Sequence, residues 1–265
     1  MASVSSRWKS SSVARRNRLW SVISYLEFAY RAFGGFREQS GQKSVCQTEM
    51  TLTAHPESEK LAGALERCRH LAGSWSGIVY RATSPRYANE GDLLTGIGSQ
   101  KEGARWNPQG LFPTVYASLE PETAMAEALA HYRYYGLPIE SAMPKVFVSV
   151  KARLNLVLPV LPVTHARVWR ERGLAREVHR SVWRALGLTF LRLRRERWRE
   201  MQDMGKEART QAIGRLCWEA KLEGLLVPSV ADLDGVNLVY FPHNRKSESS
   251  MEIINVSDLP ARRGR

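Results

Sequence analysis

Seven polar side chains in this sequence have types and positions that suit chemistry on an anionic ligand. They are Arg81, Tyr87, Arg105, Tyr116, Glu127, Ser229 and Asn237. Each is expected near the end of a strand, in a loop or near the start of a helix, where side chains can converge on one site. Guanidinium groups bind anions through paired N–H groups, and the carboxylate, hydroxyl and amide groups can orient a substrate.

Three of these residues, Arg105, Tyr116 and Glu127, lie in the stretch 103–127, which predicts a tight loop, a short strand and a helix start in succession. Gly, Asn and Pro around Arg105 favour a tight loop, in which the guanidinium and neighbouring backbone N–H groups can face an anion. Residues 114–117 have the apolar pattern of a brief buried strand, and Pro121 suits the first turn of a helix. Glu127 lies on that helix.

Glu127 has two interpretations on its predicted helix. Its position opposite the apolar residues Met125 and Leu129 favours an ordinary surface carboxylate. If that apolar stripe faces the core, the small side chains of Ala124 and Ala128 leave Glu127 at the edge of an open groove. The other six candidates have plain structural interpretations of their own, as solvated cation, core aromatic, strand cap or support for a turn.

The rest of the pattern alternates between helices and strands, which is typical of a mixed α/β fold. Helices are predicted over residues 58–72 and 210–222, the second with Thr210 as its N-cap. Residues 83–102 are predicted as a loop. Strands are predicted from apolar runs at residues 77–82, 145–150, 154–163, 225–229, 235–241 and 252–256.

The basic residues are concentrated in two segments of the 265-residue chain, whose formal net charge is +13. Residues 1–49 carry a net charge of +5 and residues 166–215 one of +8, so the remaining body is electrically balanced. Acids and regularly spaced Trp residues within 166–199 favour a helical segment whose arginines face solvent. The alternative is a nucleic-acid-binding protein that uses this segment as its electrostatic footprint.

Cysteine and histidine positions indicate neither a disulfide framework nor a metal site. The three cysteines are scattered without metal-ligand spacing, and the six histidines are dispersed. The sequence therefore predicts reduced thiols, a cytoplasmic protein and no bound metal. The apolar run 19–33 is interrupted by charges and is too short to span a bilayer, so no membrane partner is expected.

Taken together, these motifs resemble the RES domain, a family named for its Arg, Glu and Ser that comprises NAD-degrading toxins of bacterial toxin–antitoxin pairs. The resemblance covers about residues 77–258. It rests on Val79-Tyr80-Arg81, Gly103-Ala104-Arg105-Trp106-Asn107, Val115-Tyr116-Ala117-Ser118, Glu127, Gly224-Leu225-Leu226-Val227-Pro228-Ser229 and Asn237-Leu238-Val239. Ala104 stands where family members commonly have a second Gly.

The resemblance implies an ADP-ribosyltransferase-like α/β fold with a split two-sheet core and NAD bound in the cleft between the sheets. The nicotinamide–ribose bond would be cleaved with phosphate or water as acceptor, so NAD would be a consumed substrate and no cofactor would be needed. Arg81, Glu127 and Ser229 would be catalytic, whereas Arg105, Tyr116, Tyr87 and Asn237 would bind substrate. A further alternative is transfer of ADP-ribose to a macromolecule.

Four regions and one partner are expected on this basis. Residues 1–49 form a basic extension, disordered or weakly helical, which translation from Met50 would omit. Residues 50–76 supply a leading helix and a linker, residues 77–258 the catalytic domain with its Arg-rich segment, and residues 259–265 a basic tail. The family resemblance implies a small helical antitoxin that blocks the cleft. Assembly into a homo-oligomer stays open.

Overall fold

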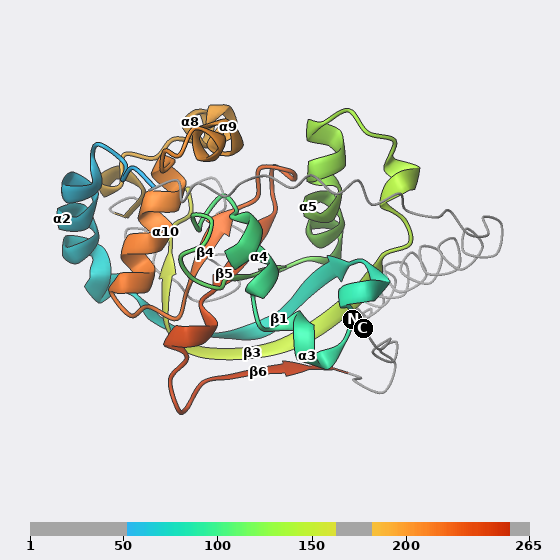
Figure 1. The fold of residues 1–265 in the computed structure, drawn as a ribbon. Coiled ribbons are helices and arrows are strands. Elements are labelled where there is room, and N and C mark those ends of the chain that lie inside the picture. Colours follow the sequence, from blue (N-terminus) through green and yellow to red (C-terminus); the bar gives the residue numbers. More distant parts are fainter. Residues whose placement is uncertain (1–51, 163–181, 255–265) are drawn as a thin grey trace, which may run out of the picture. The chain divides into compact units, whose positions relative to one another are not determined.

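The computed structural model describes residues 52–162 and 182–254 of the chain. Six strands in the order β1-β2-β5-β4-β3-β6 make up its core, and β1 also pairs with β3 (Figure 1). They are β1 (Gly73–Thr83), β2 (Val115–Ser118), β3 (Val146–Pro159), β4 (Gly224–Pro228), β5 (Val236–Tyr240) and β6 (Ser250–Ile253).

The strands divide into two groups of three. In the first group β3 pairs with both β1 and β6, and in the second β5 lies between β2 and β4. A single residue pair, Tyr80 with Ser118, joins β1 to β2, and three residue pairs join β3 to β4. The expected α/β fold with a split two-sheet core is therefore confirmed, with short junctions that connect the two sheets.

Alternation along β5 explains how the split core is filled. Val236, Leu238 and Tyr240 belong to an apolar cluster that also takes in residues of β1, β2 and β3, so these side chains face the space between the two groups. Val239 and Phe241 point the other way and join a second apolar cluster with residues of the helices. A period of two thus gives β5 two buried faces.

Helices pack against the strands β2, β5 and β4. The longer helices are α2 (Ser58–Cys68), α5 (Pro121–Tyr134) and α10 (Arg209–Glu219), and the short ones include α3 (Glu90–Leu93), α4 (Ile97–Glu102), α8 (Phe190–Arg195) and α9 (Trp198–Asp203). Figure 1 shows α2 beside α10 at one end of the molecule, and α5 apart from α8 and α9. None of the described helices combines the length and apolar character that crossing a membrane requires.

The leading helix belongs to the core rather than to a linker. Leu61, Leu65 and Cys68 of α2 are buried in the same cluster as Ile213 and Cys217 of α10. β1 begins at Gly73, inside the range 50–76 that the sequence assigns to a leading helix and a linker, so the helix and the first residues of this strand pack with the domain that follows.

Three other local predictions need correction. The predicted strand 145–150 and the first part of the apolar run 154–163 belong to one strand, β3 (Val146–Pro159), because Pro159 lies at its end and does not interrupt the ladder. The predicted loop 83–102 contains the short helices α3 and α4. The N-cap of α10 is Ala208, whereas Thr210 uses its N–H and its hydroxyl to bind Glu196. Residues 163–181 of the predicted Arg-rich helix lie outside the described residues.

A buried carboxylate ties β4 to β3 at the junction of the two sheets. Glu223 directly precedes β4, and its side chain accepts hydrogen bonds from the backbone N–H groups of Asn155, Leu156 and Lys246 at 2.6, 2.9 and 2.9 Å. Burial alone would raise the pKa of Glu223, but these hydrogen bonds, with one from Ser249, lower it below its ordinary value. The folded state therefore stabilises the charged form.

Glu223→Gln should lower the free energy of unfolding by about 2–3 kcal/mol at neutral pH, because an amide supplies no charge and turns its NH2 group toward N–H donors. The carboxylate's contribution is complete above its unfolded pKa of about 4.3 and is lost as the pH falls through the lowered folded pKa. Urea unfolding at a series of pH values should show the difference from wild type shrink in acid. Glu252→Gln, at an exposed position of β6, is the matched control; equal stability of all three proteins at neutral pH would contradict the prediction.

Candidate active site

An open cleft of about 1150 Å³ lies above the junction of β1 and β2, between α5 and the α8–α9 segment (Figure 1). Side chains from all of these elements line it. Five of the seven residues predicted from the sequence are among the lining residues: Arg81, Arg105, Tyr116, Glu127 and Asn237. The sixth, Ser229, is completely buried but hydrogen-bonded to Glu127, and its neighbours Val230 and Ala231 line the cleft.

Glu127 is held by one of its two carboxylate oxygens. Oε1 accepts a hydrogen bond of 2.6 Å from the Ser229 hydroxyl and one of 2.7 Å from the Asn237 side-chain amide. Both of these hydrogen bonds leave Oε2 of Glu127 available to a ligand. Glu127 is half-buried, with Ala124 and Ala128 beside it in the cleft wall. The interpretation of Glu127 as a residue at the edge of an open groove therefore fits the structure, and the surface-carboxylate interpretation does not.

The Ser229 hydroxyl uses its whole hydrogen-bonding capacity within the protein. It donates to Glu127 and accepts from the backbone N–H groups of Ala231 and Asp232, at 3.1 and 3.0 Å. A hydroxyl has one donor and two acceptor sites, so none remains for a substrate. Ser229 therefore positions Glu127. The resemblance implies a catalytic Ser229, whereas in this geometry its hydroxyl acts through Glu127 and has no hydrogen-bonding site left for a substrate.

Asn237 is oriented by a residue that the sequence interpretation did not select. The Ser118 hydroxyl donates to Asn237 Oδ1 at 2.7 Å, which turns the amide NH2 group of Asn237 toward Glu127. Ser118 and Asn237 face each other across the register of β2 and β5. Ser118 directly follows the predicted strand 114–117 and Asn237 lies within the predicted strand 235–241, but the sequence does not give the register that pairs them.

Arg81 and Arg105 differ in how firmly the protein engages them. Arg81 donates to the Tyr116 carbonyl at 2.9 Å and has no acidic partner among the described residues, and burial lowers its pKa to about 10. Arg105 donates to the Leu193 carbonyl at 2.8 Å and lies 3.7 Å from the Glu196 carboxylate. Burial lowers the pKa of Arg105, and Glu196 partly opposes that effect. Both guanidinium groups are charged at neutral pH.

The loop that carries Arg105 is fixed at three places. Ala104 and Asn107 exchange backbone hydrogen bonds of 2.9 and 3.3 Å, and the Tyr116 hydroxyl donates to Asn107 Oδ1 while accepting from the backbone N–H of Trp106. A side chain at Gly214 of α10 would meet the Trp106 carbonyl oxygen at 1.8 Å, so only glycine permits this contact. The Tyr116 hydroxyl thus holds the loop, and its half-buried ring lines the cleft.

Tyr87 is not brought into the site. It lies in a 3-10 turn, Pro85–Tyr87, is 53% exposed, and is absent from the cleft lining. Its ring contacts the guanidinium of Arg86, 5.5 Å from the ring centroid. The family-based expectation that Tyr87 binds substrate is therefore not supported by the position of this side chain.

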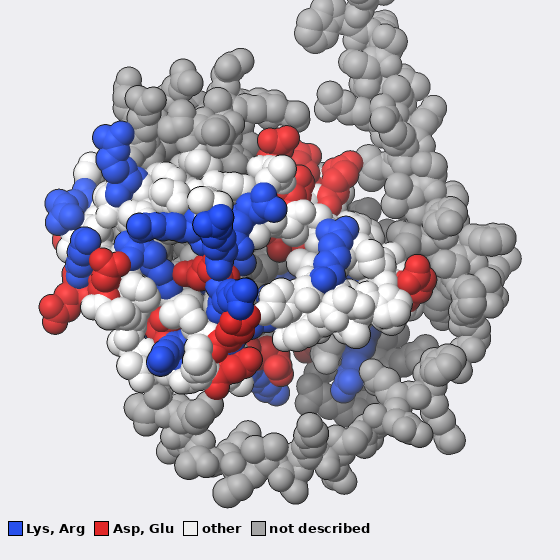
Figure 2. All heavy atoms as spheres, turned by 90° about the horizontal axis from the view of Figure 1, so that it is seen from above, with Lys and Arg blue, Asp and Glu red and all other residues white. Residues whose placement is uncertain are grey.

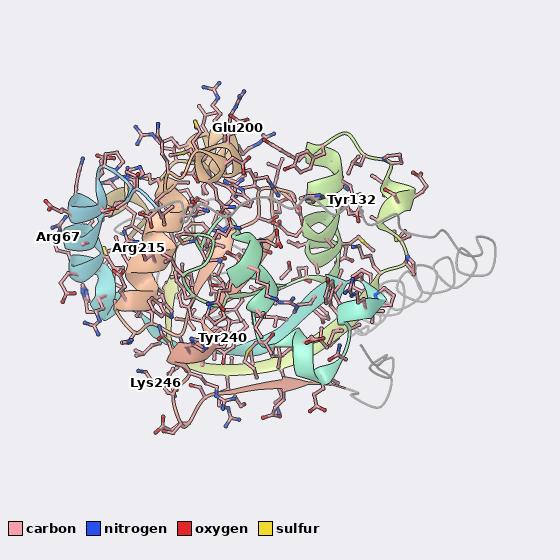
Figure 3. The ribbon with its side chains drawn as sticks, viewed as in Figure 1. Arg67, Tyr132, Glu200, Arg215, Tyr240 and Lys246 are labelled. Atoms are coloured by element: carbon pink, nitrogen blue, oxygen red, sulfur yellow. The ribbon has the colours of Figure 1, made fainter. Side chains whose placement is uncertain are left out.

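The cleft is more basic than expected from the sequence, which placed the excess of basic residues in segments 1–49 and 166–215 and left the rest of the chain balanced. Seven arginines and two glutamates line the cleft, and four of the arginines come from the α8–α9 segment: Arg194, Arg195, Arg197 and Arg199. Figure 2, which looks down on this face, shows Lys and Arg side chains gathered on the α8–α9 side. In Figure 3, Glu200 on α9 and Tyr132 on α5 mark the two sides of the mouth. The site is built to receive an anion.

No group of three or more potential metal ligands occurs among the described residues. The charged groups that converge on the cleft include the Glu127 carboxylate and the guanidinium groups of Arg81 and Arg105. Further arginines of α5 and of the α8–α9 segment also line it. Such a set can hold a phosphorylated ligand and stabilise positive charge that develops near the carboxylate.

A split α/β core with a carboxylate and arginines in its cleft defines an ADP-ribosyltransferase-like protein. Within that class the RES domain model matches residues 78–263, and the chain belongs to the RES domain family. It is similar to the NAD(+) phosphorylase MbcT of Mycobacterium tuberculosis and of Mycobacterium bovis, with 26% identity over 178 residues, 65% of this chain and 76% of each relative. The crystal structure of the M. tuberculosis MbcT–MbcA toxin–antitoxin complex matches with a TM-score of 0.53 at 20% identity, over 74% of this chain and 90% of that chain.

Arg105→Lys should raise the KM for a pyrophosphate-containing substrate by about tenfold, because an ammonium group cannot contact the Leu193 carbonyl and a phosphate with one planar fork. The assay is NAD+ consumption over a range of NAD+ concentrations. Arg192→Lys is the matched control, since Arg192 is exposed on α8 and does not line the cleft. An unchanged KM in the Arg105 variant would show that this guanidinium does not bind substrate.

Proposed function

We propose that this chain is an NAD+-consuming enzyme that cleaves the nicotinamide–ribose bond with inorganic phosphate as acceptor, and that it acts as the toxin of a toxin–antitoxin pair. The observation that carries the proposal is the Glu127 carboxylate, fixed through Oε1 at the base of a cleft whose other charged groups are predominantly arginines. The similarity to an NAD(+) phosphorylase and to the structure of a toxin–antitoxin complex supports it.

Each group in the cleft suits one part of this reaction. As the bond between ribose C1′ and the nicotinamide nitrogen breaks, its electron pair leaves with nicotinamide and positive charge develops on the ribose. Glu127 Oε2 is placed to stabilise that charge, while Arg81 and Arg105 hold the pyrophosphate and the incoming phosphate. A phosphate oxygen then forms the new bond to C1′, giving ADP-ribose 1″-phosphate and neutral nicotinamide.

The acceptor is tested by the product. The purified full chain is incubated with NAD+ in the presence and absence of inorganic phosphate, nicotinamide release is measured by chromatography, and the second product is identified by mass and 31P spectra. We expect phosphate-dependent release and a phosphorylated ADP-ribose. Release at the same rate without phosphate, with ADP-ribose as product, would make the protein a glycohydrolase, and no release in either case would overturn the proposed reaction.

The proposed role as a toxin is tested in cells. Induced expression of the wild-type chain should lower cellular NAD+ and arrest growth, whereas Glu127→Gln expressed at the same level should do neither. Co-expression of a small helical protein encoded beside it should restore growth and co-purify with the toxin. Arrest by the inactive variant would separate toxicity from NAD+ consumption and count against the proposal.

A further inference from the structure

Two arginines at the mouth of the cleft, Arg194 and Arg195, are uncommitted. Both are exposed, both line the cleft, and neither has an acidic partner among the described residues. Their neighbours differ: Arg197 forms an ion pair of 3.3 Å with Glu200, and the Arg199 guanidinium lies over the Trp198 ring at 4.3 Å. Arg194 and Arg195 therefore keep their hydrogen-bond donors for a ligand.

The backbone on both sides of this pair is fixed next to the inner cation of the cleft. Arg105 donates to the carbonyl of Leu193, the residue before the pair, and lies 3.7 Å from Glu196, the residue after it. Leu193 is buried, and Glu196 is anchored to α10 by Thr210. Arg194 and Arg195 therefore continue the positive surface of the largely buried Arg105 to the exposed part of the cleft.

The acids near the mouth do not neutralise this surface. Glu196 is engaged by Arg105 and Thr210, and Glu200 by Arg197 and the Tyr134 hydroxyl. On the opposite wall Arg133 of α5 adds a further cation, which donates to the backbone carbonyl of Ala126 at 3.5 Å. Burial, together with Arg199 and Lys145, lowers the pKa of His131 in the same wall. The mouth thus carries more positive charge than one pyrophosphate requires.

We propose that the cleft also accepts NADP+, with its 2′-phosphate bound by Arg194 and Arg195. This inference rests on the proposed function, because a dinucleotide whose nicotinamide ribose lies at Glu127 and whose pyrophosphate lies at Arg81 and Arg105 extends its adenosine ribose toward α8. The additional phosphomonoester carries a charge of about −2 and three acceptor oxygens, which match guanidinium donors. The bond that breaks and the bond that forms are those of the NAD+ reaction.

The experiment compares NAD+ and NADP+ as substrates at saturating inorganic phosphate. We expect the wild-type kcat/KM for NADP+ to equal or exceed that for NAD+. The double variant Arg194→Gln/Arg195→Gln should lower kcat/KM for NADP+ by about 30-fold and that for NAD+ by less than about threefold, since only NADP+ has a 2′-phosphate whose charge-assisted hydrogen bonds are lost. Arg192→Gln, on the same helix but outside the cleft lining, should leave the ratio unchanged.

Two outcomes would overturn this inference while leaving the proposed function intact. One is turnover of NAD+ without turnover of NADP+. The other is an equal loss with both dinucleotides together with a raised KM for inorganic phosphate, which would assign the pair to the acceptor. If neither dinucleotide is consumed, calorimetry decides: adenosine 2′,5′-bisphosphate should bind the wild type more tightly than adenosine 5′-phosphate and lose that preference in the double variant, and equal affinities would refute the site.

Discussion

Glu127→Gln should reduce the rate of NAD+ consumption by about 10³-fold while leaving the stability of the protein close to that of wild type. The amide keeps the size of the side chain but removes the negative charge that faces the developing positive charge on the ribose. Its neighbours Ser229 and Asn237 still reach an oxygen atom, Oε1, so the local hydrogen bonds can persist. The loss should appear in kcat rather than in the KM for NAD+.

The matched control is Glu122→Gln. Glu122 lies in the first turn of the same helix, is exposed and is absent from the cleft lining, so its variant should retain wild-type kinetics. Thermal unfolding of both variants separates a catalytic loss from unfolding. A Glu127→Gln protein with near-normal kcat would mean that the carboxylate does not take part in the reaction.

Asn237→Asp should produce a loss of activity that grows as the pH rises. The substitution places a second carboxylate where the amide now donates to Glu127 at 2.7 Å, and two carboxylates at that separation cannot both ionise without a large cost. At low pH the protonated Asp can still donate a hydrogen bond, whereas at neutral pH repulsion displaces Glu127. We expect a decrease in kcat of about 10²-fold at neutral pH.

The pH profile of kcat distinguishes this mechanism from simple structural damage. Partial recovery of Asn237→Asp in acid, relative to wild type at the same pH, is the expected result, and Asn237→Ala should show no such recovery because it has no titrating group. The two carboxylates would titrate as a pair rather than as separate residues. A constant ratio of Asn237→Asp to wild-type activity across the pH range would contradict the prediction.

Much of the fold could be predicted from the sequence because β2, β4 and β5 are short apolar runs, whereas the longer β1 and β3 were predicted only in part. The family motifs place Arg81, Glu127 and Ser229 on separate elements, and the structure brings these three together. Helical spacing also indicated where a groove could form, since Ala124 and Ala128 are too small to cover Glu127. Periodicity and residue size carry this information locally, so no tertiary contact is needed to see it.

The parts that could not be predicted depend on contacts between distant segments. Ser118 orients Asn237 across 119 positions of sequence, and Glu196 joins Arg105 to α10 through Thr210. The charge count assigned the arginines of α8–α9 to a basic segment outside the electrically balanced body of the protein. In the structure, several of these arginines line the cleft. Net charge along a sequence does not indicate which face of the protein will carry it.

The junction between β1 and β2 gives the cleft a mechanical property. After the single pair formed by Tyr80 and Ser118 the two strands part, and the Arg81 guanidinium spans the gap to the Tyr116 carbonyl. Arg81 therefore joins β1 to β2 beyond the last backbone pair of these two strands. The side chain that is expected to bind the ligand is therefore also one that joins the two strands at the cleft.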